Sequence, residues 1–397
     1  MRKITLIGAG AGPATITAEA KTALAEARLV IGPKRLLRDL PVCPEALCAE
    51  AALAEKITAV LEANPDADAC ILLSGDSGFY SGAHALLPLL SGYEVSILPG
   101  ISSLQLFAAR LQQPWQNWRL CSAHGKTCDA VYEVCHRAPA FFLTGGEHSP
   151  ATLCRALTEA GLGFLPVAAG EELGTAQEKV TQGTAEEFAE RSFSSLSVLL
   201  AAAAPRPAVP SGALPDERFR RLPDVPMTKQ DVRAAVLAHL AVTEGETCWD
   251  IGAGTGSVGI ELALRAGSVW GVECRPEALA LAEENRKMLG AWNYRLIEGI
   301  APEALKALPA PDAVFVGGSG GKLSDVVNTA YTANPEARLC VAAVTLETLS
   351  GACEALAALG READVIQLSV ARSRAAGRSH LMLAQNPVYL IMGGRKA

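Results

Sequence analysis

Apolar runs and helix-like stretches alternate through the C-terminal half of the chain. Strands are predicted at 246–251, 268–272, 293–298, 311–316, 336–343, 362–370 and 387–393. Helices are predicted between them at 228–241, 256–265, 276–289, 320–333 and 346–359. This alternation indicates a doubly wound α/β sheet. The last two strands have no helix between them, so they are expected to pair as an antiparallel hairpin at the sheet edge, joined by the Arg-rich segment 372–378.

The N-terminal half also alternates, with other spacings. Strands are predicted near 4–7, 28–31, 69–73, 93–98, 119–122 and 140–143. After Pro166 the pattern loosens into strand-like pieces at 179–182 and 196–202, which indicate a second α/β lobe. The two halves do not repeat each other, so we expect a fusion of unlike domains.

A proline-rich stretch separates the halves. Between Pro205 and Pro226, prolines and charges replace the apolar periodicity found on both sides. Such a composition is typical of a domain boundary. We therefore expect a first domain at 1–204, a linker at 205–226 and a second domain at 227–397.

A glycine-rich turn between a strand and a helix is the clearest chemical signal. Trp249-Asp-Ile-Gly-Ala-Gly-Thr-Gly256 brings the backbone close to a ligand at a helix N-terminus. A second strand ends in Glu273, roughly twenty residues further on, where an acid accepts ribose hydroxyls. The pattern predicts a nucleoside site and resembles motif I of S-adenosylmethionine (SAM) methyltransferases. The residues assigned to it are Asp250, Gly252, Gly254, Thr255, Gly256, Glu273 and Gly299.

A second glycine cluster ends the predicted fourth strand of this half. Its residues Gly317, Gly318, Ser319 and Gly320 should face the SAM methyl group, and their small size leaves space for a bulky flat substrate. A flexible loop without a ligand is the alternative interpretation.

Strand-to-turn segments in the N-terminal half suggest a second ligand site. Leu72–Tyr80, Ile97–Ser103 and Phe141–Glu147 each place glycines at the end of an apolar strand. Each segment alone also fits an ordinary turn. Together and in this order they resemble the tetrapyrrole methylase family, whose corresponding loops hold SAM between two lobes. The resemblance assigns SAM to Gly8, Gly10, Gly75, Asp76, Gly78, Ser102, Ser103 and Thr144.

The resemblance extends over nearly the whole chain. Ser74–Tyr80, Pro99–Gln105, Leu111–Trp115, His124-Gly125 and Leu143–Pro150 resemble a module that methylates carbon 5 in the cobalamin pathway. Pro226–Lys229, Trp249–Val258, Asp312–Gly321, Ala343–Thr348 and Ser373–Gly377 resemble a module that methylates carbon 15 and decarboxylates. A chain with both is similar to the family of decarboxylating precorrin-6Y C5,15-methyltransferases. This implies a two-lobed tetrapyrrole methylase fold followed by a Rossmann-like class I SAM methyltransferase fold.

Three positions depart from the family pattern. Ser77 and Ala11 stand where the N-terminal loops usually have proline, and Ile300 stands where an acid usually binds the adenine amino group. These departures favour one alternative, a SAM- or tetrapyrrole-binding protein with a single active half. Another alternative is methylation of a different small molecule by the C-terminal domain.

The implied reaction uses two SAM molecules and a precorrin tetrapyrrole, and it removes the acetate carboxylate on ring C. Cations should bind the other substrate carboxylates, since arginine pairs with carboxylates through two hydrogen bonds. The candidate anchors are Lys229, Arg233, Lys322, Arg372, Arg374 and Arg378, and His380 could move a proton. Each charge taken singly also fits a solvated surface position.

Composition limits the possible partners. The net charge of -7 and pI near 5.5 argue against a nucleic-acid partner. The 11 cysteines form no Cys-x-x-Cys pair, so we expect free thiols in the cytoplasm and neither a disulfide framework nor a metal site. No apolar run is long enough to span a membrane. We further expect a homo-oligomer.

Overall fold

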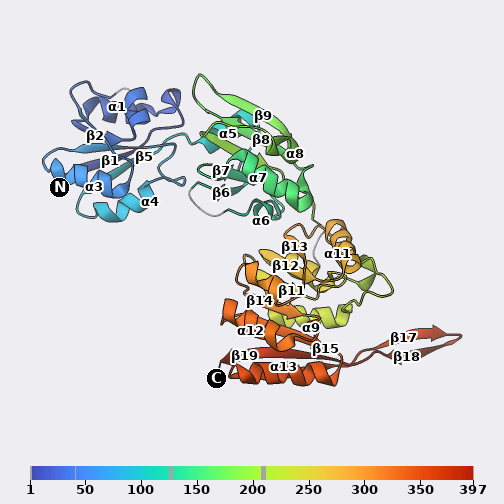
Figure 1. Ribbon diagram of the computed structural model, residues 1–397. Coiled ribbons are helices and arrows are strands. Elements are labelled where there is room, and N and C mark those ends of the chain that lie inside the picture. The colour runs from blue at the N-terminus through green and yellow to red at the C-terminus, as the bar shows by residue number, and fades with distance from the viewer. Residues whose placement is uncertain (1, 41, 125–127, 207–211, 397) are drawn as a thin grey trace. The chain divides into compact units, whose positions relative to one another are not determined.

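The computed structural model describes residues 2–40, 42–124, 128–206 and 212–396. The chain divides into an N-terminal unit, Met1–Ala203, and a C-terminal unit, Ala204–Ala397 (Figure 1). Each unit is an α/β structure, which confirms the predicted fold class. Among the described residues, no helix has the length and apolar character needed to cross a membrane.

The first sheet of the N-terminal unit is parallel throughout. Its strands lie in the order β3 (Leu47–Glu50), β2 (Leu29–Gly32), β4 (Ala69–Leu73), β1 (Lys3–Gly8) and β5 (Glu94–Leu98). The accompanying helices are α1 (Ala18–Glu26), α2 (Lys34–Asp39), α3 (Ala54–Ala63) and α4 (Ala83–Leu86). Leu29 and Ile31 pack into one core and Val30 into another, so apolar side chains cover both faces of the sheet.

The second sheet of the N-terminal unit is mixed. Its strands lie in the order β6 (Arg119–Ser122), β7 (Ala140–Leu143), β10 (Ser197–Ala201), β8 (Pro166–Glu171) and β9 (Lys179–Thr184). Only β6 and β7 pair in parallel. The helices in this part are α5 (Ser103–Leu111), α6 (Ala130–Val134), α7 (Pro150–Leu157) and α8 (Ala185–Ala189). The second lobe expected from the sequence is therefore present.

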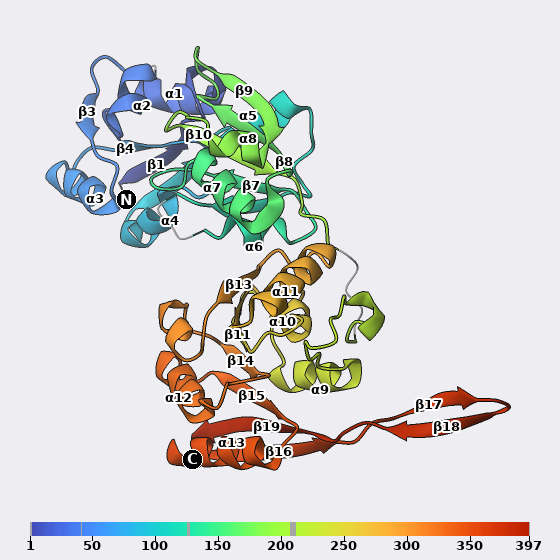
Figure 2. The same ribbon diagram turned by 45° about the vertical axis from the view of Figure 1, so that its right-hand side comes forward.

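The C-terminal unit is built on a seven-stranded sheet (Figure 2). The strand order is β13 (Tyr294–Glu298), β12 (Ser268–Glu273), β11 (Thr247–Ile251), β14 (Ala313–Val316), β15 (Arg338–Ala343), β19 (Val388–Lys396) and β16 (Arg361–Leu368). The helices are α9 (Gln230–Leu240), α10 (Ser257–Ala263), α11 (Pro276–Met288), α12 (Leu323–Ala333) and α13 (Leu346–Ala358). Cys248 packs into a core with α9 and α10, whereas Trp249 packs into a core with α12 and α13. The sheet is thus covered by helices on both faces.

The end of the C-terminal sheet differs from the sequence prediction. Strands β16 and β19 pair antiparallel as expected, but β19 is also inserted next to β15. The Arg-rich connection, expected as a loop, is itself a hairpin of β17 (Ala371–Ala376) and β18 (Ser379–Ala384), which extends beyond the sheet in Figure 1. Gly377 lies in its turn with φ +61°, a conformation suited to glycine. Every residue of both strands is exposed, so this segment lacks the alternation of apolar and polar residues that predicts a strand.

Two strands of the N-terminal unit were missed. Strand β3 carries mostly exposed residues, so it gives no apolar run. Strand β8 begins at Pro166 and is rich in alanine and glycine, which have weak strand propensity. Hydrogen bonding of β8 to β10 and β9 stabilises a strand whose residues have weak strand propensity.

Part of the predicted linker packs on the C-terminal unit. Of its residues 205–226, those at 207–211 lie outside the described part of the chain. Leu214 and Phe219 are buried in the core that contains α9 and α10. The Leu214 amide donates to Glu261, and its carbonyl accepts from Arg233. The segment around Leu214 and Phe219 therefore belongs to this unit.

These contacts predict where the chain can be divided. Residues 1–203 and 204–397 should each fold alone, whereas 215–397 should lose about 3 kcal/mol or more, because Glu261 and Arg233 lose buried partners and the core loses Leu214. Urea unfolding of the two C-terminal fragments measures this difference. Equal stability of 204–397 and 215–397 would contradict the assignment of the segment to the C-terminal core.

Candidate functional site

The C-terminal unit has a cavity of about 250 Å³ at the carboxyl ends of β11, β12 and β14. Parallel strands of open α/β sheets bind ligands at this edge. Seven of the predicted site residues line it: Asp250, Gly252, Gly254, Glu273, Gly317, Gly318 and Gly320. The structure therefore brings together the glycine-rich turn, the acid after β12 and the second glycine cluster.

Two glycine loops touch each other through their backbones in this cavity. Gly252 has φ +73°, and a Cβ atom there would lie 2.6 Å from the carbonyl oxygen of Gly318. Gly254 has φ +55°, and its added Cβ would lie 3.0 Å from the oxygen of Pro226. Side chains at 252 or 254 would thus strain the backbone and enter the space beside the cavity.

The Glu273 carboxylate connects the end of β12 to the glycine turn. One oxygen accepts a hydrogen bond from the Gly254 amide at 2.8 Å. The other accepts from the amides of Cys274 at 3.0 Å and Arg275 at 3.1 Å. The side chain is buried yet lines the cavity, so its oxygens are fixed at the cavity wall.

The Asp250 carboxylate connects β11 to helix α10 and to β13, which lies two strands away in the sheet. Its buried Oδ2 accepts from the Gly259 amide at 3.0 Å and from the Tyr294 hydroxyl at 2.5 Å. Burial raises the pKa of Asp250 from 3.8 to about 6 and the pKa of Tyr294 well above 10. A Cβ atom on Gly259 would lie 2.2 Å from the Tyr294 ring, so the small residue is needed for this contact.

Four other predicted residues near the cavity do not line it. Thr255 is buried, and its Oγ1 has no hydrogen-bond partner among the described residues. Gly256 precedes α10 with φ +75° and packs against Ala282. The Gly299 amide donates to the Glu273 carbonyl, and Ser319 lies within the second glycine cluster.

The predicted substrate anchors also lie outside this cavity. Lys229 precedes α9, Arg372 pairs with Asp231 at 2.5 Å, and Arg374 and Arg378 are exposed on the β17–β18 hairpin with His380. Lys322 pairs with Glu303 at 2.9 Å.

The interpretation of Arg233 as a substrate anchor is wrong. Its side chain is fully buried, donates to Asp216 at 2.8 Å and lies 3.5 Å from Glu261. A cation that the sequence interpretation missed, Arg275, does line the cavity and lies 3.8 Å from Glu273. Its position two residues after the acid was the available signal.

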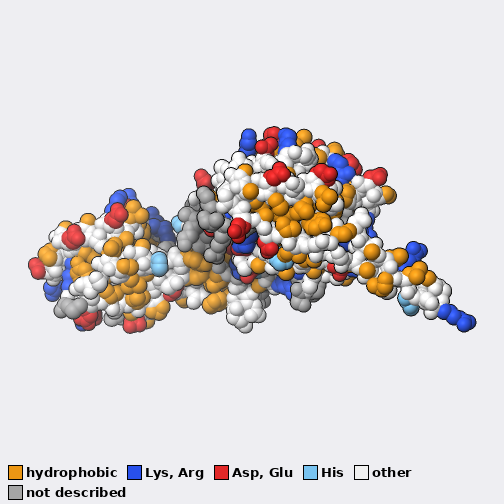
Figure 3. Space-filling view, turned by 90° about the horizontal axis from the view of Figure 1, so that it is seen from below, with side chains coloured by type: hydrophobic (Ala, Val, Ile, Leu, Met, Phe, Trp, Pro, Cys, Tyr) orange, Lys and Arg blue, Asp and Glu red, His pale blue; other side chains and the backbone are white. Residues whose placement is uncertain are grey.

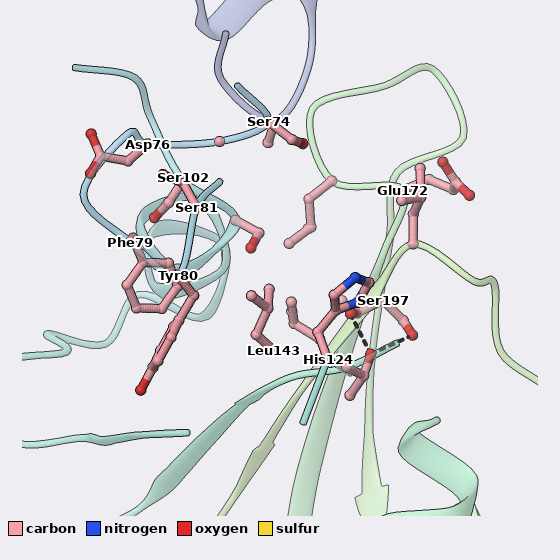
Figure 4. Close-up of a pocket in the computed structure, with 18 of the residues that line it drawn as sticks. Ser74, Asp76, Phe79, Tyr80, Ser81, Ser102, His124, Leu143, Glu172 and Ser197 are labelled. Carbon is pink, nitrogen blue, oxygen red and sulfur yellow. Dashed lines mark hydrogen bonds between the residues drawn. The ribbon is translucent and has the colours of Figure 1, made fainter. Parts of the chain in front are cut away.

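The N-terminal unit has a cavity of about 290 Å³, lined by residues from both of its sheets (Figure 4). Of the predicted SAM residues, Gly75, Asp76, Ser102, Ser103 and Thr144 line it. The Asp76 carboxylate accepts from the Gly78 amide at 2.8 Å and the Gly100 amide at 3.1 Å. Asp76 therefore fixes two loops that leave different strands.

The predicted residues Gly8, Gly10 and Gly78 do not line this cavity but support its loops. Gly10 and Gly75 exchange backbone hydrogen bonds of 3.1 and 2.9 Å. A Cβ atom on Gly8 would lie 2.5 Å from the amide nitrogen of Gly100. The first crossover and the two later loops are thus in direct backbone contact.

Side-chain hydrogen bonds also fix two further lining residues, Ser102 and Thr144. Ser102 caps α5 in a reciprocal capping box with Gln105. Thr144 Oγ1 lies 3.0 Å from Ser197 Oγ and donates to the Ser197 carbonyl.

The sequence interpretation missed several lining residues, among them Arg35, Tyr80, Ser81, His124 and Glu172. Both Tyr80 and Glu172 have φ +48°, and non-glycine residues in that region often lie at functional sites. Positive φ cannot be read from a sequence. His124 stood in a family-like segment, whose Gly125 lies outside the described residues.

Known proteins are similar to both units. Residues 3–189 match the family Tetrapyrrole (Corrin/Porphyrin) Methylases, and residues 220–393 match Precorrin methyltransferase domain. A precorrin-6Y C(5,15)-methyltransferase (decarboxylating) from Sinorhizobium sp is 33% identical over 94% of this chain and 92% of its own. A probable cobalt-precorrin-6B C(15)-methyltransferase (decarboxylating) from Pyrobaculum calidifontis is 42% identical over 45% of this chain and 93% of its own. A crystal structure of a precorrin-6y C5,15-methyltransferase from Geobacter metallireducens is 35% identical over 47% of this chain and 97% of its own, with a TM-score of 0.45.

The buried Asp250 predicts a pH-dependent stability. Its pKa is raised on folding, so between about pH 4 and 6 the folded state binds a proton that the unfolded state has released. The free energy of unfolding should therefore fall as pH rises through this window, by up to about 3 kcal/mol relative to Asp250→Asn. Urea unfolding of residues 204–397 measures it, with the exposed Asp325→Asn as control. A difference between wild type and Asp250→Asn that is constant with pH would contradict the buried titration.

Proposed function

The chain belongs to the precorrin-6Y C5,15-methyltransferase (decarboxylating) family, and we propose that it methylates carbons 5 and 15 of a precorrin-6-type tetrapyrrole with SAM and decarboxylates the ring C acetate. This reaction is a step of cobalamin biosynthesis. The observation that carries the proposal is one glycine-walled cavity in each unit, at the ends of parallel strands. We place the enzyme in the cytoplasm, since 11 scattered cysteines without a Cys-x-x-Cys pair suit a reducing compartment.

The residues of the C-terminal cavity fit a SAM molecule. A Cβ atom would fill the cradle at Gly252, and the fixed Glu273 carboxylate retains acceptor capacity for ribose hydroxyls. SAM supplies an already activated methyl group, so the protein contributes mainly orientation. Ile300, which stands where an acid usually binds the adenine amino group, has an exposed side chain, so that contact comes from another residue or is lost.

The N-terminal cavity fits a second SAM molecule held in a different way. Gly75, Ser102 and Thr144 bring backbone and hydroxyl groups to its wall from three loops. The carboxylate of Asp76 keeps two of these loops together even though Ser77 replaces the usual proline. Two unlike architectures support two separate methylations, one in each unit.

We assign decarboxylation to the C-terminal cavity. Its wall at Gly317, Gly318 and Gly320 carries no charged side chain, and these glycines leave room for a flat macrocycle. Among the described lining residues, Arg275 is the only cation, and it already donates to the Asp224 carbonyl at 2.9 Å. An acetate beside these three glycines would contact uncharged residues, which favours loss of carbon dioxide. The conjugated macrocycle accepts the electron pair of the broken C–C bond, and a proton from solvent then completes the methyl group on ring C.

The other substrate carboxylates need cations, which we propose are Lys229, Arg372, Arg374 and Arg378. Arg374 and Arg378 are exposed on the hairpin, and Arg372 makes an exposed ion pair that water screens. Because the ion pair with Asp231 is exposed and weak, replacing Asp231 by a substrate carboxylate costs Arg372 little free energy.

We also propose that the protein forms a homo-oligomer through the β17–β18 hairpin. Leu381, Met382 and Leu383 are 57%, 65% and 45% exposed there. Figure 3 shows hydrophobic and basic side chains together on this projection. A lone two-stranded hairpin is marginally stable in water. A second copy of the chain would stabilise it by burying these apolar side chains.

The two methylations should be separable. In the full chain, Asp76→Ala with Gly78→Val should leave decarboxylation and one methyl addition, whereas Gly254→Val should remove decarboxylation with its methylation. The affected activity should fall at least about 100-fold in each variant. Valine at 78 or 254 adds a side chain to a glycine loop, and Asp76→Ala removes the hydrogen bonds that join two loops. Mass spectrometry of the products distinguishes these outcomes.

Gly92→Val and Gly212→Val serve as controls, because no heavy atom lies within 4 Å of a Cβ at either position. Both should keep the complete reaction. Decarboxylation retained in Gly254→Val would overturn its assignment to the C-terminal cavity.

The hairpin proposal has its own test. Leu381→Glu with Leu383→Glu should reduce the molar mass in solution from oligomer to monomer, because buried charges destabilise an apolar contact. Light scattering after gel filtration measures the mass. The exposed Leu53→Glu variant, in the N-terminal unit, should keep the mass of the wild type. An unchanged mass in the hairpin variant would contradict the proposal.

A further inference from the structure

We propose that His124 is the base that removes the proton from the ring carbon methylated in the N-terminal cavity, an inference that rests on the proposed function. The enamine carbon forms its bond to the methyl group as the S–CH₃ bond breaks and sulfur keeps that electron pair. The ring is then a cation whose methylated carbon still carries hydrogen. Transfer of this proton to His124 returns the C–H electron pair to the conjugated ring, and the imidazolium loses the proton to solvent.

The fold places His124 at the edge where the cofactor loops meet. Strand β6 ends at Ser122, which pairs in parallel with Leu143 at the end of β7. His124 and Thr144 therefore leave the same edge of the sheet, and both line the cavity. Figure 4 shows His124 near Ser197 and Leu143, with the side chains from the loops of the first sheet across the cavity.

Gly145 makes room for the imidazole. A Cβ atom at this position would lie 1.9 Å from His124 Nδ1 and 2.7 Å from its Cε1. Gly145 does not have positive φ, in contrast to Gly146, which has φ +62°. The backbone thus permits a side chain at 145, and the histidine ring does not. The contact between Gly145 and the imidazole therefore fixes the place of the His124 ring.

The ring of His124 has no hydrogen bond or ion pair with any other residue in the described part of the chain. The cavity's other titratable side chains are already engaged. Asp76 accepts from two amides, Tyr80 donates to the Leu120 carbonyl at 2.9 Å, Glu172 accepts from Ser194, and Arg35 donates to Ser74 at 3.3 Å.

The partner-free imidazole is therefore the side chain best placed to accept a proton. Its side chain is exposed, so the proton can also leave to water. Imidazole is the side chain most suited to this task near neutral pH.

The full-chain variant His124→Gln tests this role. Its addition of the carbon-5 methyl should slow by about 10²- to 10⁴-fold, the usual contribution of a general base. The product should still have lost the carboxylate and should carry the other methyl group. A substrate deuterated at the bridging carbon should show a larger isotope effect in the variant, because proton removal then limits the rate.

SAM binding and chemical rescue separate this role from a structural one. SAM affinity measured by calorimetry should stay within about threefold of the wild type, and free imidazole should restore part of the rate. His84→Gln, on exposed α4 residue His84 outside the cavity, should behave like the wild type.

Gly145→Ala gives an independent test, because it displaces the ring without altering a cavity-lining residue. It should slow the same methylation with SAM affinity retained. Normal methylation with an unchanged isotope effect in His124→Gln would overturn the base assignment. Failure of the wild-type N-terminal cavity to bind SAM would instead overturn the proposed function.

Discussion

Backbone-to-backbone contact between glycine loops is the constraint on which both candidate sites depend. In the N-terminal unit a Cβ atom on Gly100 would lie 2.3 Å from the Gly75 oxygen and 2.4 Å from the Gly8 oxygen. In the C-terminal unit one on Gly252 would lie 2.6 Å from the Gly318 oxygen. These contacts let loops from different strands converge at one sheet edge, where a cofactor can meet amides and carbonyls.

An aspartate holds the converging loops in each unit, in a different way in each. Asp76 accepts directly from the amides of two loops, whereas Asp250 lies behind its loop and bonds Gly259 and Tyr294. A buried carboxylate with satisfied hydrogen bonds fixes geometry at a cost in desolvation, seen in the raised pKa of Asp250. The two units therefore fix their loops at the sheet edge through different hydrogen bonds. Two unlike sites suit two methylations of one substrate.

Sequence patterns predicted the features that are formed by residues close together along the chain. The strand, glycine turn and helix around Asp250 and the acid Glu273 follow one another along the chain, so their meeting at one edge could be predicted. The partners of Arg233 come from residues 216 and 261, and its burial could not be predicted from charge alone. The lining roles of Arg275 and Glu172 depend on tertiary position and, for Glu172, on a positive φ. The assignment of the glycines to SAM remains a prediction.

The stoichiometry of SAM binding to the full-length protein tests the central claim most directly. Isothermal titration should give two molecules per chain, with residues 1–203 and 204–397 binding one each. Two binding events per chain would match one cavity in each unit. A single molecule per chain, with either unit unable to bind SAM, would contradict the account of two independent methylation sites.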